Sequence, residues 1–257
     1  MTAGELPVAI HLAAAAMGTR FELVLHGADQ GALRAAGESA IERIEDAHRT
    51  FTRFESSSLL AHLRRVAPAT VSVDRDTMTL FADAREVARR SGGAFDPTRA
   101  GRWTDLRIDR PRQRLSLAHA DVELDLGAIA KGHAIDLAVA ALRDAGITSA
   151  FVHGGTSSGF GLGRPPGGTA WRVAWRGGSE IFDLVDQAYS VSSTEQTRSG
   201  AESRHVRDPR IRDWVPTPRR AAVVGPGARL ADAWSTAALV QGRRPAAMGD
   251  EWKVWIS

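Results

Sequence analysis

The sequence predicts an α+β fold, in which mixed but largely antiparallel sheets are flanked by helices. Two observations lead to this class. Segments that alternate apolar and polar residues occur in close pairs separated by turns, as the strands of hairpins do. Other segments place apolar residues at three- and four-residue steps, as amphipathic helices do. A chain of 257 residues allows one large domain or two small ones.

The expected strands are short and apolar or alternating. They cover residues 19–26, 70–73, 122–126, 147–153, 171–175, 181–185, 221–224 and 252–256. The expected helices each carry an apolar stripe along one face. They cover residues 33–51, 74–90, 134–142 and 231–241. The second of these helices is expected to end at Ser91-Gly92-Gly93, because glycine often follows the last helical turn.

The remaining segments are expected to be loops because they are polar or rich in glycine and proline. They cover residues 52–58, 94–98, 127–132, 159–168 and 190–203. The loop 127–132 lies between an expected strand and an expected helix, and a further strand follows that helix. This order gives a strand–loop–helix–strand unit in the middle of the chain.

The composition excludes several classes of protein. The chain has no cysteine, 43% hydrophobic residues and 25% charged residues. The absence of cysteine excludes a disulfide-stabilised domain, a cysteine-based metal site and a thiol nucleophile. The hydrophobic and charged fractions are typical of globular proteins and exclude extended disorder.

The charge pattern and the hydropathy also limit the partners. Lysine and arginine together number 33 against 30 acidic residues, and Lys131 and Lys253 are the only lysines. No long basic block occurs, so we do not expect a nucleic-acid partner. No stretch approaches the roughly 18–20 apolar residues of a membrane helix, and the N-terminus lacks the basic flank and apolar core of a signal peptide. We therefore expect a cytoplasmic protein.

The segment from Asp125 to Gly132 is a candidate phosphate site. Its small residues let backbone amides approach a ligand, and the N-terminus of the following helix favours an anion. Lys131 can place a positive charge on a phosphate, and Asp125 can hydrogen-bond a base or a ribose. The glycine spacing fits neither a P-loop nor a dinucleotide fingerprint. The alternative is a tight turn with a surface lysine.

Asp232 and Thr236 are a candidate metal site. The two residues are four apart in an expected helix, so both side chains project from one face. A carboxylate and a hydroxyl are hard oxygen ligands that suit Mg²⁺, which usually keeps water or substrate phosphate as its other ligands. The alternative is an N-capping aspartate and a solvated threonine.

Two further motifs carry side chains of catalytic or binding types. His205 and Asp208 are three residues apart and could act as a base and the group that orients it, although a turn with a surface histidine is the alternative. Phe95 and Asp96 follow an expected helix end and could pack against a flat ring. The alternative for Phe95 is a core side chain before a proline turn.

Three weaker features have simple structural explanations. Gly154-Gly155 follows an expected strand and could admit a ligand, but such glycines usually only turn the chain. Phe54 could stack on a ligand or anchor the loop to the core. His48 lies on the apolar face of the first expected helix and is interpreted as a core histidine.

These motifs, taken in order, resemble those of the ApbE family of FAD:protein FMN transferases. The matching pieces are Met17-Gly18-Thr19, Arg53-Phe54, the segment 91–97, the segment 124–132, the segment 152–155, His205-Val206-Arg207-Asp208-Pro209 and the segment 231–237. They extend over nearly the whole chain. The ordered set is much more specific than any single piece, and the central block is the most specific of them.

The resemblance implies a single domain over residues 1–257, with FAD and Mg²⁺ in a cleft between two lobes. It assigns the FAD site to Met17, Phe54, Ala94, Phe95, Asp96, Asp125, Lys131 and Val206. It assigns the Mg²⁺ site to the carbonyl of Ala128 and the side chains of Asp232 and Thr236. It also implies an activity: FAD is split at its pyrophosphate, AMP is released, and FMN is attached to a threonine of an acceptor protein. Lys131 would then neutralise phosphate charge, and His205 could take the proton from the threonine hydroxyl.

The sequence departs from the family pattern at three places. Thr156 follows the double glycine where an acidic or amide residue is usual, Ser192-Ser193-Thr194 replaces a Thr-Ser-Gly segment, and the segment 210–213 replaces a Thr-Gly turn. Two alternatives to the transferase therefore stay open. One is a Mg²⁺-dependent FAD pyrophosphatase, in which water replaces the threonine hydroxyl. The other is a catalytically weakened FAD-binding protein.

Overall fold

The computed structural model describes residues 8–99, 101–195 and 206–257. Five α-helices occur within these ranges, together with a short 3-10 helix at Trp103–Asp105. The α-helices are α1 Gln30–Phe51, α2 Leu59–Val66, α3 Arg75–Arg90, α4 Ala130–Asp144 and α5 Ala228–Gln241.

Seven of the described strands form one large sheet in the order β1-β2-β6-β7-β10-β13-β14. Their bounds are β1 Val8–Ala16, β2 Thr19–Gly27, β6 Ser149–Gly154, β7 Ser158–Leu162, β10 Gln187–Ser193, β13 Arg220–Gly225 and β14 Lys253–Ile256. A small sheet of β3 Val71–Ser72, β5 Arg114–Leu117 and β4 Leu106–Asp109 lies apart from it. Two hairpins complete the set: β8 Trp171–Ala174 with β9 Ile181–Leu184, and β11 Arg207–Asp208 with β12 Asp213–Trp214.

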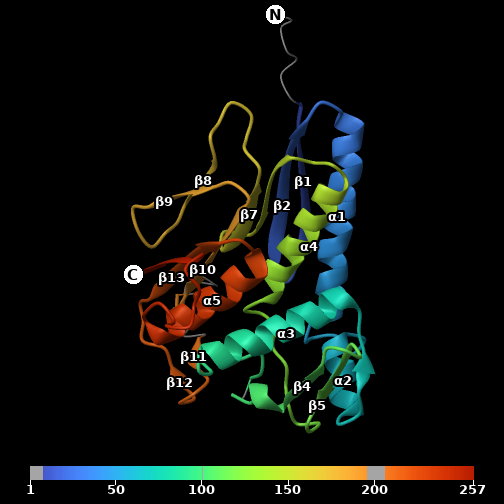
Figure 1. Ribbon diagram of the computed structural model, residues 1–257, viewed down its shortest axis with the longest axis vertical. Coiled ribbons are helices and arrows are strands. Elements are labelled where there is room, and N and C mark those ends of the chain that lie inside the picture. Colours follow the sequence, from blue (N-terminus) through green and yellow to red (C-terminus); the bar gives the residue numbers. More distant parts are fainter. Residues whose placement is uncertain (1–7, 100, 196–205) are drawn as a thin grey trace, which may run out of the picture.

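The large sheet has helices on one face and a hairpin on the other. Helices α1, α4 and α5 pack against the strands on one face. On the other face, aromatic residues from β8, β9 and β10 form a separate cluster that includes Trp175, Phe182 and Tyr189. Helices α2 and α3 and the small sheet form a second part of the molecule below the large sheet (Figure 1). The main hydrophobic core continues through both parts, from Phe21 in β2 to Phe81 in α3 and Leu115 in β5.

The predicted fold class is confirmed, and every strand pair that the described residues form is antiparallel. The four expected helices are present as α1, α3, α4 and α5. Asp74 caps the N-terminus of α3 because its side chain accepts a hydrogen bond from the amide of Thr77 at 2.8 Å. The expected ending of this helix at Ser91 is also confirmed.

The expected strand at residues 122–126 is wrong. This segment forms only one isolated bridge, between Thr98 and Leu124. Two backbone hydrogen bonds hold it beside the loop after α3, from Arg99 to the carbonyl of Glu123 and from Asp125 to the carbonyl of Pro97. The neighbouring chain is itself an irregular loop, so an alternating pattern of five residues does not extend into a ladder.

Two segments expected to be loops contain strands. β7 begins at Ser158 and contains Gly159 and Gly161. A Cβ atom at Gly159 would meet Tyr189 at 2.6 Å, and one at Gly161 would meet Trp171 at 2.8 Å, so the two glycines leave room for these aromatic side chains. β10 includes Ser190 to Ser193, where serines replace the apolar residues expected of a buried strand. The sequence analysis also missed β1, α2 and the β4–β5 hairpin. The alanines of β1 have little preference for a strand, so its pairing with β2 decides its structure.

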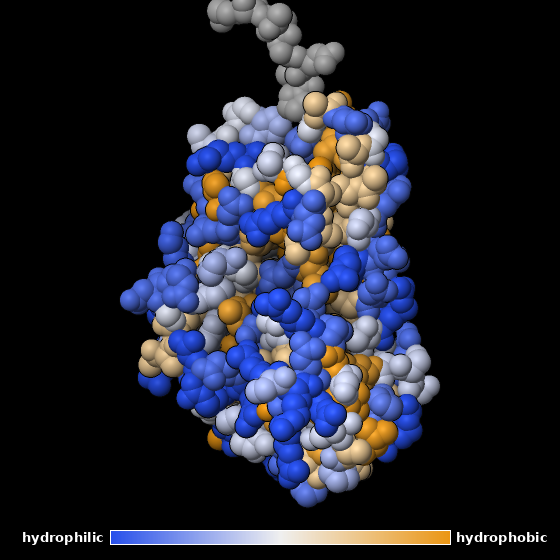
Figure 2. Space-filling model, turned by 45° about the vertical axis from the view of Figure 1, so that its right-hand side comes forward, coloured by the Kyte–Doolittle hydropathy of each residue, from blue (hydrophilic) through white to orange (hydrophobic). Residues whose placement is uncertain are grey.

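The surface is mostly hydrophilic on the face that includes α1 and α2. Figure 2 shows apolar side chains gathered near the upper end of this face, below the grey N-terminal trace. Within the described ranges, no helix is both long and apolar enough to cross a membrane.

Candidate functional site

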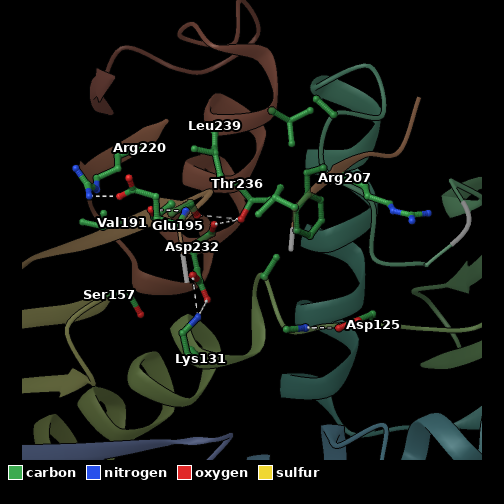
Figure 3. A pocket seen from close by; sticks show the side chains of 18 of the residues that line it. Asp125, Lys131, Ser157, Val191, Glu195, Arg207, Arg220, Asp232, Thr236 and Leu239 are labelled. Atoms are coloured by element: carbon green, nitrogen blue, oxygen red, sulfur yellow. Dashed lines mark hydrogen bonds and ion pairs between the residues drawn. The ribbon is translucent and has the colours of Figure 1, made fainter. Parts of the chain in front are cut away.

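A cleft of about 1160 Å³ lies where the two parts of the molecule meet. Its walls come from the loop after α3, the segment before α4, the N-terminus of α4, one face of α5, and strands β10 and β11. Nine of the residues that the sequence analysis selected line it: Ala94, Phe95, Asp96, Asp125, Ala128, Lys131, Val206, Asp232 and Thr236. The fold therefore gathers motifs from four distant parts of the chain (Figure 3).

Asp232 is the most enclosed charged side chain of the cleft. It is 3% exposed, and its carboxylate lies 3.4 Å from the ammonium of Lys131. The amide of Gly132 donates a hydrogen bond to the same carboxylate at 3.2 Å, and the hydroxyl of Ser190 donates one at 3.0 Å. The N-cap of α5 is Gly227, so the interpretation of Asp232 as an N-capping residue is wrong.

Thr236 continues this polar group one helical turn further along α5. Its hydroxyl lies 3.2 Å from the hydroxyl of Ser192, which is also 2.8 Å from that of Ser235. Ser190 and Ser192 alternate in β10, so both project toward α5. The sequence analysis expected residues 190–203 to be a loop and named Ser192 only as a departure from the family pattern, so it did not predict that these serines face α5.

Gly132 explains why the N-terminus of α4 reaches Asp232. A Cβ atom at this position would meet the carbonyl oxygen of Ala228 at 2.1 Å. Only glycine therefore lets α4 approach the first turn of α5 this closely. The preceding Lys131 lies in the first turn of α4, where it faces the cleft beside Asp232. Lys131 and Asp232, which the resemblance assigns to the FAD and Mg²⁺ sites, thus lie side by side on one wall of the cleft.

A buried charged cluster lies behind this wall. Asp136 of α4 accepts hydrogen bonds from the amides of Ala228 and Arg229, at 2.8 and 3.0 Å, and so caps α5 from another helix. The guanidinium of Arg229 also pairs with Asp83 of α3 at 2.8 Å. Burial raises the pKa of Asp136, and Arg229 with the two amides only partly offsets this. The cluster joins α3, α4 and α5.

His133 belongs to the same cluster and is held neutral. Arg229 lies 3.3 Å from its Nδ1, so this nitrogen accepts and the proton resides on Nε2. Nε2 has no hydrogen-bond partner among the described residues. Burial, with the charge of Arg229 nearby, lowers the pKa of His133 to about 3. The histidine therefore packs as an uncharged ring against Phe51, at a centroid distance of 5.5 Å.

The opposite wall begins with Phe95 and Asp96. Phe95 is 1% exposed and belongs to the main core, so the interpretation of a core side chain holds even though it also lines the cleft. One oxygen of Asp96 accepts from the amide and hydroxyl of Thr98, and the other accepts from the amide of Trp103 at 3.2 Å. Burial raises the pKa of Asp96 against the lowering effect of these hydrogen bonds.

Asp125 occupies the exposed end of the same wall. Its side chain is 37% exposed and lies 3.6 Å from the guanidinium of Arg53. One carboxylate oxygen accepts from the amide of Gly127 at 3.0 Å, and the other is the oxygen that faces Arg53. Arg53 also lines the cleft, and the sequence analysis quoted it only as a neighbour of Phe54.

Three of the selected residues are not placed in the cleft by the described structure. Met17 packs on the main core with a φ of 51°, and its amide donates to Nδ1 of His48 at 3.3 Å. Phe54 is 80% exposed beneath the guanidinium of Arg53, at 4.2 Å, so a core anchor is wrong for it. His205 lies outside the described residues. The roles of all three in FAD binding or catalysis stay predictions.

The residues after His205 are held by their own contacts. Asp208 accepts two hydrogen bonds from the guanidinium of Arg210, at 2.8 and 2.6 Å. Although burial raises the pKa of Asp208, these bonds outweigh it and lower the pKa below its ordinary value. Asp208 is therefore occupied by Arg210, which weakens its expected role as the orienting partner of His205.

Gly155 has a structural explanation, because a Cβ atom there would meet the hydroxyl of Thr19 at 2.4 Å.

The charges of the cleft favour an anionic ligand. The basic side chains that line it are Arg53, Arg99, Lys131, Arg176, Arg207 and Arg220, and the acidic ones are Asp96, Asp125, Glu195 and Asp232. The basic side chains thus outnumber the acidic ones, and one of the acidic ones, Glu195, is already paired with Arg220. Thr156, Ser192 and Ser193, at two of the places where the sequence departs from the family pattern, also line the cleft.

The oxygen ligands for a cation are few. No group of three or more His, Asp or Glu side chains with metal-binding geometry exists in the described part of the chain. Asp232 and Thr236 both face the cleft, and their oxygens suit a hard cation that takes its other ligands from water or a phosphate. The residues therefore fit Mg²⁺ bound together with a phosphorylated ligand, and do not fit an ion held by protein side chains alone.

Comparisons with known proteins identify the family of the chain. The model of the ApbE family matches residues 17–102 and 99–249. A FAD:protein FMN transferase of Rhodobacter capsulatus is 28% identical over 265 residues, which cover 88% of this chain and 50% of that protein. The chain thus spans about half the length of this curated relative.

Solved structures show the same fold. The ApbE protein of Thermotoga maritima superposes with a TM-score of 0.78 at 21% identity, covering 91% of this chain and 87% of that one. The flavin transferase ApbE of Vibrio cholerae gives 0.77 at 20% identity, covering 98% and 97%. The family match extends over most of the sequence and includes both walls of the cleft. The chain therefore belongs to the ApbE family.

Proposed function

We propose that this protein transfers FMN from FAD to a threonine of an acceptor protein, releases AMP, and requires Mg²⁺. One observation carries the proposal. The ammonium of Lys131, a phosphate-binding group, lies 3.4 Å from Asp232, and Thr236 lies one turn away on the same wall of the cleft. The family match and the curated relative, a FAD:protein FMN transferase, support the reaction class.

The size and charge of the cleft suit a dinucleotide. Its volume of about 1160 Å³ slightly exceeds the usual range of about 300–1,000 Å³ for small-molecule sites, as a large dinucleotide requires. Lys131 and the amides at the start of α4 favour the diphosphate, because both present positive charge to an anion. Asp96 and Asp125 on the opposite wall provide acceptors for the hydroxyl and amino groups of a nucleoside.

Asp232 and Thr236 would hold Mg²⁺, together with the carbonyl of Ala128. Bound there, Mg²⁺ would neutralise charge that develops on the diphosphate oxygens. Lys131 now shares the carboxylate of Asp232, and its flexible side chain can turn to the phosphate when FAD binds. Gly132, Ser158 and Ser190 keep Asp232 in place from the other side.

The acceptor threonine must lose its proton as its oxygen attacks phosphorus. We assign this proton transfer to His205, as the family resemblance implies. Because Asp208 is held by Arg210, the assignment does not depend on a His205–Asp208 pair.

The pyrophosphatase is the second candidate. Thr156 and Ser192 line the cleft where the sequence departs from the family pattern. Hydroxyls at these positions can hold a water molecule near the diphosphate, and water would then replace the threonine hydroxyl.

Incubation of the protein with FAD and Mg²⁺, with and without a threonine-containing acceptor protein, tests the proposal. We expect AMP, and an acceptor whose mass has increased by that of FMN minus one water, only when the acceptor is present. AMP without acceptor would favour the pyrophosphatase, and tight FAD binding without AMP would favour a binding protein. Asp232→Ala should abolish Mg²⁺-dependent AMP release. The matched control is Asp186→Ala, which removes an exposed carboxylate that pairs with Arg143 and should leave the rate unchanged.

A further inference from the structure

A second groove, of about 570 Å³, adjoins the cleft on the side of α2. Its floor is apolar, because Leu60 of α2 and Leu124 are each 5% exposed. Its rim is formed by arginines from three places: Arg53 before α2, Arg64 and Arg65 in the last turn of α2, and Arg99 after α3.

The groove concentrates positive charge. Four arginines and one glutamate line it, which gives it a formal charge of +3, the same as that of the whole chain. Charge is therefore close to balanced over the rest of the molecule. A concentrated field of one sign attracts an oppositely charged partner and increases its rate of association.

The arginines keep capacity for such a partner. Glu123 is shared between Arg64 and Arg99, at 3.5 and 3.4 Å, so one carboxylate faces two guanidinium groups. Arg65 contacts the carbonyl of Ser56 and the ring of His62, and no carboxylate of the described residues pairs with it. Arg64 and Arg99 remain 55% and 52% exposed.

The groove adjoins the candidate active site. Arg53 and Arg99 line both the groove and the cleft. A chain that lies in the groove would therefore end beside the Arg53–Asp125 pair at the border of the cleft.

We propose that this groove, lined by Arg53, Arg64, Arg65 and Arg99, binds an acidic segment of the acceptor protein. The proposal rests on the proposed function, which requires an acceptor. The guanidinium groups are held at several points of the groove: Arg53 at Asp125, Arg65 at the carbonyl of Ser56, and Arg64 with Arg99 around Glu123. An extended segment with several carboxylates matches this distribution, and its apolar side chains can cover Leu60 and Leu124. A single phosphate would meet only part of it.

The test uses a fluorescein-labelled hexaglutamate peptide and fluorescence anisotropy, with neither FAD nor Mg²⁺ present. We expect the full chain to bind the peptide, and the double variant Arg64→Glu/Arg65→Glu to bind it at least about 10-fold more weakly. Binding should weaken between about 0.1 M and about 1 M salt, because screening shortens the range of the attraction. Since the assay needs no catalysis, its failure is distinct from failure of the proposed flavin transfer.

A matched double variant controls for net charge. Arg34→Glu/Arg172→Glu makes the same change in charge at two exposed arginines that pair with Glu38 and Asp183, outside the groove and the cleft. It should keep the affinity within about twofold. If Arg64→Glu/Arg65→Glu does not fold, as checked by circular dichroism, Arg64→Gln/Arg65→Gln carries the test with a smaller loss in the same direction.

Three results would overturn the proposal. The folded groove variant could bind the peptide as tightly as the wild type. The control variant could lose as much affinity as the groove variant. Finally, AMP could displace the peptide from the wild type and itself bind more weakly to the groove variant, which would make the groove a nucleotide site.

Discussion

The two walls of the cleft are built differently. The α4–α5 wall is held by helix-to-helix contact: Gly132 lies against Ala228, Asp136 caps α5, and Asp232 is enclosed by Lys131, Gly132 and Ser190. The opposite wall consists of loops, in which Asp125 is 37% exposed and hydrogen-bonds mainly to its own chain neighbours. The groups that we propose to orient a diphosphate thus lie on packed helices, whereas those that we propose to contact a nucleoside lie on loops.

The comparison predicts that substitutions in the helical wall destabilise the whole protein. The largest effect is expected for Gly132→Ala, whose Cβ would lie 2.1 Å from the carbonyl oxygen of Ala228. The atoms that this Cβ would meet, in Ala228 and Arg229, all belong to the backbone of α5, so the two helices must separate. We therefore expect a loss of more than about 3 kcal/mol in the free energy of unfolding. Urea denaturation measures it.

Gly31→Ala is the control for this substitution. Gly31 lies in the first turn of α1, where a Cβ would meet only an oxygen of Asp29 at 3.3 Å. This variant should be neutral or more stable by up to about 1 kcal/mol, because alanine has the higher helix propensity. Equal losses in both variants would contradict the role assigned to the α4–α5 contact.

Removal of the carboxylate behind the wall should have the next largest effect. Asp136→Ala leaves the amides of Ala228 and Arg229 without their acceptor and removes a partner of the Arg229 guanidinium. We expect a loss of about 3 kcal/mol, as for breaking a buried charged pair. Asp136→Asn keeps one acceptor and should lose less. Thermal or urea unfolding of both variants would show whether this order holds.

The pH dependence of stability should report His133. Its pKa is lowered from 6.5 to about 3, so between these values the unfolded chain binds more protons than the folded one. The free energy of unfolding should therefore fall as the pH is lowered, by about 2 kcal/mol between pH 7 and pH 5 from this residue alone. In His133→Gln this contribution should be absent. Parallel pH profiles of wild type and variant would show that His133 titrates normally.

The smallest effect on stability is expected in the loop wall. Asp125→Asn changes a partly exposed side chain and keeps an oxygen that can accept from Gly127. The free energy of unfolding should change by less than about 0.5 kcal/mol. If Asp125 binds FAD, the KM for FAD should rise about 10-fold, the cost of one hydrogen bond to a charged group. A large loss of stability would show that the two walls do not differ as described.

Some of these features were accessible from the sequence. Periodicity located α1 and α3 because each buries an apolar stripe on the core, and it also located α4 and α5, although α5 is buried on nearly all sides. Strands were harder to locate. β1 has alanines in place of residues that favour strands, and 122–126 has the alternation of a strand but lies beside an irregular loop. Pairing partners decide both cases: the neighbouring β2 forms a full ladder with β1, whereas the loop around Thr98 gives residues 122–126 a single bridge.

The sequence by itself determined the α+β class, the ordered motifs of the ApbE family, and the chemical types of the site: a lysine in a small-residue segment and a carboxylate with a hydroxyl one helical turn apart. Only the tertiary structure decided that Asp232 is enclosed by Ser190 and Gly132, that Asp136 caps α5, and that four arginines converge on a second groove. The physical reason is that motifs record local backbone and side-chain requirements. Burial, close helix packing and a local electric field arise between residues as far apart as Gly132 and Asp232, and these are set when the chain packs.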